Sequence, residues 1–450
     1  MTRDAARLRS RAGGLPELLK LAGPVMLGRL GIMAMGLTDT IVVGRYSSTQ
    51  LGYHALGWAP TAVVLTTAVG LLNGVQVMTS RALGEGRPDK TGAVFRRGVV
   101  YSLWIGAACA VVLFLLGPAL LQALGLGADL ARGAGQVTRV FALSLPMYLV
   151  ATAATGFLEG LSRPLPGMLA MWGANVVNLV LNLVLVPGRF GLDPMGAVGG
   201  AWSTFGARLV LMVALIAYIA MMPQARALGV LSRPADDRHG EAELRRIGHG
   251  AGVSLFMESC AFAGMNVVAG WLGGLAVAGW AVVLNVISVI FMAPLGLAIA
   301  TSVLVARAYG ARDHQAVVRA GQLGFGVCIA TATLTVLVVW PAAPWIARLY
   351  STDPALIRLT TGALVLSCLF LVADALQVVA AMALRARGEV WVPTFIQFAS
   401  YALVMLPLGW ALALPAGLGF NGIIWAVFVA SMLSASLLLG RFWMLARQRL

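Results

Sequence analysis

Long runs of apolar residues restrict what this chain can fold into more than any other feature. Each run is around 20 residues long, the length of helix that crosses a hydrocarbon core about 30 Å thick. Hydrophobic residues make up 60% of the 450-residue chain and charged residues only 11%, whereas ordinary soluble domains carry about 25% charged residues. Because such a composition cannot form a water-soluble surface, the sequence predicts an all-α polytopic membrane protein.

Twelve runs are long enough to form transmembrane helices. They cover residues 16–43, 52–79, 99–121, 137–158, 167–187, 196–221, 249–271, 275–304, 320–340, 359–382, 392–413 and 420–440. We therefore expect twelve membrane crossings, in the inner or plasma membrane of the cell.

The net charge of +15 would suit a protein that binds nucleic acid, so the positions of the basic residues matter. Most of the 32 Lys and Arg residues lie in alternate connections, on the cytoplasmic side if the N-terminus is cytoplasmic. This alternation follows the positive-inside rule of membrane proteins. We expect both termini and the loop at residues 223–248 to be cytoplasmic, the lipid bilayer to be the main partner, and no nucleic acid to bind.

An internal repeat relates the two halves of the chain at an offset of about 226 residues. The segment 80–84 matches 306–310, and each closes a long span ahead of a basic loop. Each half holds six spans, which makes the repeats parallel, and transporters built this way bind their substrate between the repeats near mid-bilayer. The sequence predicts two six-helix bundles, 1–222 and 249–450, joined by a cytoplasmic linker at 223–248.

Motifs for catalysis or nucleotide binding are weak. The segment 84–91 approaches a phosphate-binding loop, but Asp89 replaces its second glycine and would place a carboxylate near the phosphate. The histidines are scattered, which indicates neither a metal pair nor a catalytic base: His54, His239, His249 and His314. We expect no enzyme activity and no cofactor, so that transport is either driven by an ion gradient or passive.

Three carboxylates, Asp39, Glu258 and Asp374, lie inside predicted spans. A charged Asp at the centre of a membrane helix costs at least about 2.5 kcal/mol, so each needs a partner or a cavity. Helical rise from the cytoplasmic arginines places Glu258 and Asp374 at one depth, about 16–18 Å into the membrane, with Gln377 one turn from Asp374. Two like charges in a low dielectric favour a bound proton, Na⁺ or organic cation. These three residues form the predicted coupling or substrate site of the second half, with Glu258 and Asp374 as candidate Na⁺ ligands.

Asp39 belongs to a different layer, because it lies only six residues before Arg45 and therefore about 9 Å below the outer boundary. Asn178 and Asn182 occupy one face of the fifth span at a matching depth, and Thr204 of the sixth span reaches the same layer. Such side chains often serve only to join membrane helices. Their convergence on an acid favours a second functional cluster. Three other polar residues are interpreted as helix contacts: Asn175, Ser203 and Asn285.

A family resemblance runs through nearly the whole chain and rests on seven stretches in order. They are LTDTIVVG (37–44), NVVNLVLN (175–182), GAVGGAWST (196–204), FMES (256–259), DALQ (374–377), ALRARG (383–388) and SYALVMLPLG (400–409). With these stretches the sequence resembles the multidrug and toxic compound extrusion (MATE) family.

The resemblance implies a V-shaped pair of six-helix bundles that exports drug-like, often cationic compounds in exchange for Na⁺ or H⁺. The presence of both Glu258 and Asp374 is similar to the bacterial NorM-type branch of the family. Some relatives carry Asp where Asn182 stands, so it stays open whether the cluster in the first half binds Na⁺.

The resulting prediction is a cation-coupled antiporter, coupled to Na⁺ or H⁺, that works as a monomer by alternating access. Its substrates are drug-like, cationic or amphipathic small molecules. The main alternative is a lipid-intermediate flippase of the related fold, which would need a wide cationic cavity. Away from the ends of the predicted spans, only Arg29 and Arg208 are basic, against three acids, which disfavours that alternative. A channel and an intramembrane enzyme are weaker alternatives still.

Overall fold

The computed structural model describes residues 14–123, 127–232 and 238–448. Both chain ends, whose predicted location is cytoplasmic, lie outside the described residues, as does the middle of the loop at residues 223–248.

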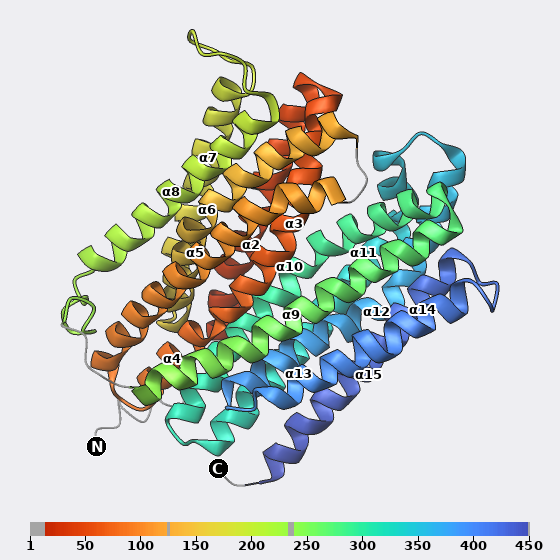
Figure 1. Ribbon diagram of the computed structural model, residues 1–450. Coiled ribbons are helices and arrows are strands. Elements are labelled where there is room, and N and C mark those ends of the chain that lie inside the picture. The colour runs from red at the N-terminus through yellow and green to blue at the C-terminus, as the bar shows by residue number, and fades with distance from the viewer. Residues whose placement is uncertain (1–13, 124–126, 233–237, 449–450) are drawn as a thin grey trace. The chain divides into compact units, whose positions relative to one another are not determined.

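All regular structure in the described ranges is helical (Figure 1). The helices are α2 (Leu15–Tyr46), α3 (Ser48–Leu71), α4 (Asn73–Gly84), the short η1 (Pro88–Lys90), α5 (Thr91–Ala123), α6 (Ala128–Gly160), α7 (Leu165–Leu185), α8 (Gly196–Met221), α9 (Arg238–Leu272), α10 (Gly274–Gly310), α11 (His314–Tyr350), α12 (Pro354–Ala386), α13 (Trp391–Phe398), the π-helical η2 (Ala399–Met405), α14 (Leu406–Ala413) and α15 (Phe420–Arg447). Within the described residues, twelve segments are long and apolar enough to cross a membrane, and they correspond one to one with the predicted spans. The all-α class with twelve spans is confirmed.

The helix ends differ from the predicted ones in a way that matters for the site. The tenth predicted span ends at residue 382, but α12 continues to Ala386 and so includes Arg385. The helix is longer than the predicted span because the apolar signal fades before the helix ends. Arg385 keeps only 4% of its surface exposed.

The eleventh span is irregular, with the π-helical segment η2 between α13 and α14. Pro407 lies in the first turn of α14 and has no N–H to donate to the preceding turn. In a π-helix the backbone hydrogen bonds join residues five apart, so each turn holds about one residue more than in an α-helix. Short π-helical segments often occur at functional sites. This segment contains the buried Tyr401.

Backbone contacts divide the chain into two compact units. The N-unit runs from Leu27 to Gly252, and the C-unit combines Val253–Leu450 with the chain up to Met26. The division falls inside α2, two residues after Pro24. The bundles 1–222 and 249–450 describe the sequence repeat and remain a proposal about how the chain is organised.

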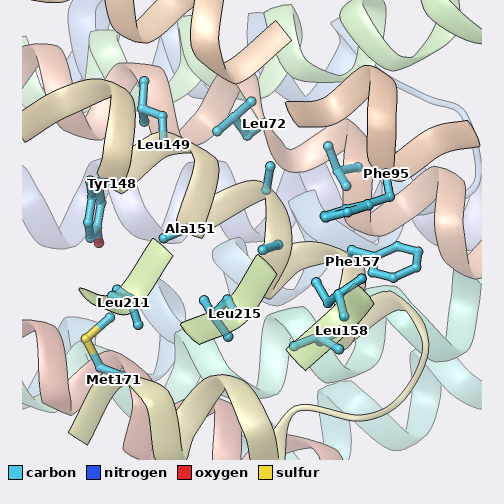
Figure 2. Packing of buried hydrophobic residues seen from close by; sticks show 14 of the residues in the cluster. Leu72, Phe95, Tyr148, Leu149, Ala151, Phe157, Leu158, Met171, Leu211 and Leu215 are labelled. Atoms are coloured by element: carbon cyan, nitrogen blue, oxygen red, sulfur yellow. The ribbon is translucent and has the colours of Figure 1, made fainter. Parts of the chain in front are cut away.

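One helix lies at the centre of each unit. In the N-unit this is α6, the fourth span, and in the C-unit it is α12, the tenth span, which are the most buried helices of their units. Figure 2 shows the N-unit core, where Tyr148, Leu149 and Phe157 of α6 pack among residues of α5, α7 and α8. The ring of Phe157 lies 4.7 Å from that of Phe95. The outer helices instead expose large apolar side chains, such as Trp104 and Leu115 of α5, to the surroundings, as a bilayer permits and water does not.

Candidate functional site

The Asp39 carboxylate of α2 is the centre of a buried polar cluster in the N-unit. Asn178 and Asn182 of α7 donate from Nδ2 to its Oδ1 atom at 2.9 and 2.7 Å. The Thr204 hydroxyl of α8 donates to its Oδ2 atom at 2.5 Å. Asp39 is 3% exposed, and Asn178, Asn182 and Thr204 are also buried. All four residues predicted to meet at this depth are in contact.

Asparagine and glycine residues allow α2, α7 and α8 to approach each other around Asp39. Asn178 and Asn182 are one turn apart on α7, so both amides face α2. Gly200 of α8 has no side chain, and a Cβ there would lie 2.9 Å from Val43 Cγ2, closer than ordinary packing permits. Asn175, two turns before Asn182, donates to the Gly31 carbonyl oxygen at 2.9 Å and makes the helix contact predicted for it.

His54 of α3 is a further member of this cluster, which we did not predict. Its Nε2 atom lies 3.9 Å from Asp39 Oδ2, and the side chain is buried. The imidazole packs edge-on against the Phe141 ring of α6 at 5.5 Å. The depth of His54 was a usable signal: it lies six residues into α3, and Asp39 lies seven before the end of α2. We call Asp39, His54, Asn178, Asn182 and Thr204 the Asp39 cluster.

Arg208 lies one helical turn after Thr204 on α8 and is 4% exposed. Its guanidinium lies 4.7 Å from the centre of the Tyr148 ring and 5.7 Å from that of Trp58. It donates to the Ser144 hydroxyl at 2.7 Å and interacts electrostatically with Asp39. Aromatic faces therefore stabilise a buried cation beside the Asp39 cluster.

Asp374 of α12 is the centre of a second buried cluster, in the C-unit. Its Oδ1 atom accepts hydrogen bonds from Gln377 Nε2 at 3.4 Å and from the Tyr401 hydroxyl at 3.3 Å. Gln377 also donates to the Tyr401 hydroxyl at 2.8 Å. The predicted pair of Asp374 and Gln377 is in contact, and Tyr401 of η2 is an additional member that we did not predict.

Glu258 of α9 joins this cluster through charge. It interacts electrostatically with Asp374, a like charge, and with Arg385, an opposite one. Arg385 is eleven residues after Asp374 on α12, which places both on the same side of the helix about 16 Å apart. Of the two acids that the sequence placed at one depth, Glu258 therefore has a buried counter-charge.

Neutral side chains connect Arg385 with Asp374. Arg385 Nη2 donates to Gln397 Oε1 at 2.8 Å and to the Ser254 hydroxyl at 2.7 Å. Gln397 in turn donates to Gln377 Oε1 at 3.2 Å. A continuous hydrogen-bonded chain thus runs from Arg385 through two glutamines to the acid. We call Glu258, Asp374 and the residues of this chain the Asp374 cluster, whose other members are Gln377, Tyr401, Gln397, Arg385 and Ser254.

A small cavity of about 10 Å³ lies in the C-unit close to this cluster. Leu371 is one of its lining residues and precedes Asp374 by one turn of α12. Its other lining residues are Ile290, Ala293, Pro294, Thr331, Ala332 and Thr335. A cavity of this size has room for about one water molecule.

Comparison with known families gives a match over most of the chain. The sequence pattern of the MatE family matches residues 24–184 and, a second time, residues 251–411. The two matched ranges begin 227 residues apart, close to the offset of the predicted repeat.

Individual relatives cover almost the full length. A probable multidrug resistance protein NorM of Caulobacter vibrioides is 57% identical over 431 residues, covering 96% of this chain and 92% of that protein. The multidrug resistance protein PmpM of Pseudomonas aeruginosa is 30% identical over 411 residues, covering 90% of this chain and 85% of that protein. The solved outward-facing conformation of a multidrug resistance MATE family transporter has the same fold, with a TM-score of 0.89 at 20% identity and 98% coverage of both chains.

Proposed function

Because this chain belongs to the MatE family of membrane transporters, we propose that it is a cation-coupled antiporter that exports drug-like, cationic or amphipathic compounds by alternating access. The names of its relatives from Caulobacter vibrioides and Pseudomonas aeruginosa support multidrug substrates. Coupling of transport to a cation is supported by the burial of Asp39 and Asp374 inside membrane helices, where each accepts hydrogen bonds from neighbouring side chains. Charges in such places mark ion and substrate pathways.

In the Asp374 cluster, two carboxylates and one guanidinium leave a net charge of −1 when all three are ionised. A single proton, Na⁺ or substrate cation neutralises that charge. Because one charge cannot hold two cations well, the coupling ion and a cationic substrate compete for it. Competition of this kind produces exchange, in which entry of the ion releases the substrate.

In the Asp39 cluster, neutralising the carboxylate removes the charge around which two amides and one hydroxyl are oriented. Shifting a conformational population from 1:99 to 99:1 takes about 5.5 kcal/mol. Loss of hydrogen bonding at one buried group supplies only about 1–3 kcal/mol. The Asp39 cluster therefore biases the conformational change of the transporter, and the rest comes from substrate binding and the membrane potential.

Efflux from proteoliposomes under one imposed gradient at a time tests this function. A Na⁺ gradient or a pH gradient should each be applied alone, with a fluorescent cationic dye as the substrate. We expect one of them to drive dye movement, and an ionophore that collapses that gradient to stop it. Dye movement that is equal with and without both gradients would refute coupled antiport and would indicate a passive pathway.

A lipid-intermediate flippase receives no support from the buried arginines. Arg29 forms an ion pair with Glu159 at 3.2 Å, Arg208 packs against Tyr148, and Arg385 is countered by Glu258. A site for a pyrophosphate lipid would need guanidinium groups that face an open cavity.

The proposed location is the inner or plasma membrane, with cytoplasmic termini. Single cysteines at Arg226 and Asp193, both exposed, test this orientation in a variant that lacks the four native cysteines. A membrane-impermeant maleimide added to intact cells should label the Asp193→Cys variant and not the Arg226→Cys variant until the cells are opened. Equal labelling of both variants in intact cells would contradict the twelve-span orientation.

A further inference from the structure

His54 presents a buried polar atom that the described residues leave without a partner. Its Nε2 atom has no hydrogen-bond partner, although the side chain is only 6% exposed. The nearest charged atom is Asp39 Oδ2 at 3.9 Å, too far for a hydrogen bond and close enough for an ionic contact. Buried imidazole nitrogens are normally hydrogen-bonded, so an unpaired one that faces a carboxylate suggests a missing proton or ligand.

The hydrogen bonds of Asp39 show where a proton fits. An ionised carboxylate offers about four lone-pair positions. Asn178 and Asn182 occupy two of them on Oδ1, and Thr204 occupies one on Oδ2. The remaining position is on Oδ2, the oxygen that faces His54.

We propose that His54 is the second proton-binding group of the Asp39 cluster, so that Asp39 and His54 take up one proton between them. This inference rests on the proposed function and names H⁺ as the ion to which this cluster responds. The proton comes from the outer aqueous side, and the charge of the pair changes from −1 to 0 as it binds. No covalent bond between heavy atoms forms or breaks.

A proton on His54 Nε2 preserves the existing hydrogen bonds of the carboxylate. Asp39 stays ionised and keeps its three donors, and the new N–H forms a charge-assisted bond once the gap closes to about 2.8 Å. The cluster therefore contracts across α2 and α3 by about 1 Å when the proton binds. A proton on Asp39 alone would add a donor to a group that already accepts three.

Asp39 and His54 are the main titratable groups at this place, because the neighbouring helices contribute mostly groups that do not titrate. Next to His54, α6 contributes the Phe141 ring, α8 contributes Gly200, and α7 contributes amides that do not titrate. Among the residues that the structure describes, the further charge that acts on this pair is Arg208 of α8, which interacts electrostatically with Asp39. Arg208 favours the ionised carboxylate and therefore a proton located on the imidazole. A cation already present at this place also repels Na⁺.

Histidine NMR and transport assays test the proposal together. In protein labelled with ¹⁵N-histidine, the His54 signal is identified by its loss in His54→Gln, with His249→Gln as the control variant. His249 lies in the same unit, 3.2 Å from the Tyr101 hydroxyl and outside the Asp39 cluster. We expect Asp39→Asn to shift the titration midpoint of His54 by about one pH unit or more, because two coupled groups titrate as a pair. An unchanged His54 titration in Asp39→Asn would overturn the proposal.

In proteoliposomes, His54→Gln should slow efflux driven by a pH gradient by about tenfold, the effect of displacing a proton equilibrium by one pH unit. The affinity for the dye should stay close to that of the wild type, and His249→Gln should behave as the wild type. A His54→Gln variant that binds dye and keeps the wild-type dependence on external pH would refute the role of His54. If His54→Gln does not fold, the NMR titrations of wild type and Asp39→Asn still decide, with His54→Asn used for assignment. The absence of any gradient-driven efflux in the wild type would instead refute the proposed antiport, while the titration of His54 would remain a separate result.

Discussion

The Asp39 cluster and the Asp374 cluster hold buried acids in two different ways. Around Asp39, three neutral donors converge on a single carboxylate. Two of them lie one turn apart on α7, and the third comes from α8. Around Asp374, two glutamines connect the acid with Arg385 over about three turns of α12, and Glu258 interacts with both charges electrostatically. A compact cage responds to a charge change at one atom, whereas an extended network distributes that change over several side chains.

The two clusters are not copies of each other, although the helices that hold them repeat. At the repeat offset of 226 or 227 residues, Asp374 corresponds to Met147 or Tyr148, and Asp39 corresponds to Met265 or Asn266. Neither half carries an acid at the position that matches the acid of the other half. The repeat has thus preserved the membrane helices, which depend on apolar length, while each half has acquired its own polar site.

Replacing Asp374 should have the largest effect on transport. In Asp374→Asn the cluster keeps Glu258 and Arg385, whose charges cancel, so no net charge is left to attract a cation. We expect gradient-driven efflux to fall to the level of empty vesicles while the protein stays folded and inserted. Efflux assays and thermal melting check this, with Glu85→Gln, an exposed carboxylate paired with Arg87, as the control. Near-wild-type efflux would show that Glu258 suffices and that the two acids are redundant.

Replacing Asp39 should separate binding from transport. Asp39→Asn removes the negative charge and replaces one of the two acceptor oxygens by an NH₂ group, and it leaves the Asp374 cluster unchanged. We expect dye binding to persist and gradient-driven efflux to be lost. Equilibrium dye binding and efflux should be measured on the same preparation. If transport keeps its dependence on external pH or Na⁺, the Asp39 cluster has no part in coupling.

Removing a single hydroxyl from each cluster should give the smallest effects on efflux. The two effects show which cluster depends more on one hydrogen bond. Hydrogen bonds between membrane helices are worth about 0.6–2 kcal/mol, or roughly threefold to thirtyfold in an equilibrium. Thr204→Val should lie near the upper end, because Thr204 donates to Asp39 Oδ2, whereas the two asparagines donate to Oδ1. Tyr401→Phe should lie near the lower end, because its bond to Asp374 is 3.3 Å long and Gln377 still donates. Efflux rates of the two variants provide the comparison. A larger loss of efflux in Tyr401→Phe than in Thr204→Val would show that the Asp374 cluster, and not the Asp39 cluster, depends more on a single contact.

Much of the site could be predicted from the sequence because depth in a membrane is a one-dimensional quantity. Counting residues along straight helices brought Asp39 to the level of Asn178, Asn182 and Thr204, and the structure joins them by hydrogen bonds. The same arithmetic applied to His54 would have added it. We limited the arithmetic to acids and their polar partners, and the histidines were considered only as metal ligands or catalytic bases.

Arg385 shows where reasoning from the sequence was insufficient. A basic residue at the end of an apolar run is usually a loop residue on the cytoplasmic side. Here the helix continues past the run, and Gln397, Ser254 and Glu258 from other segments receive the guanidinium. Those partners lie more than a hundred residues away or in an irregular span, so no local pattern indicates them.

The sequence by itself determined the membrane class, the twelve spans, the repeat and the level at which Asp39 meets Asn178, Asn182 and Thr204. These properties follow from apolar length, the cost of burying charge and the rise of a helix, all of which are local. Only the tertiary structure decided which side chains share a cluster: His54 with Asp39, Tyr401 with Asp374 and Arg385 with Glu258. The rotation of each helix about its axis depends on the packing of all its neighbours, and in a chain this apolar the hydrophobic pattern alone does not specify that rotation.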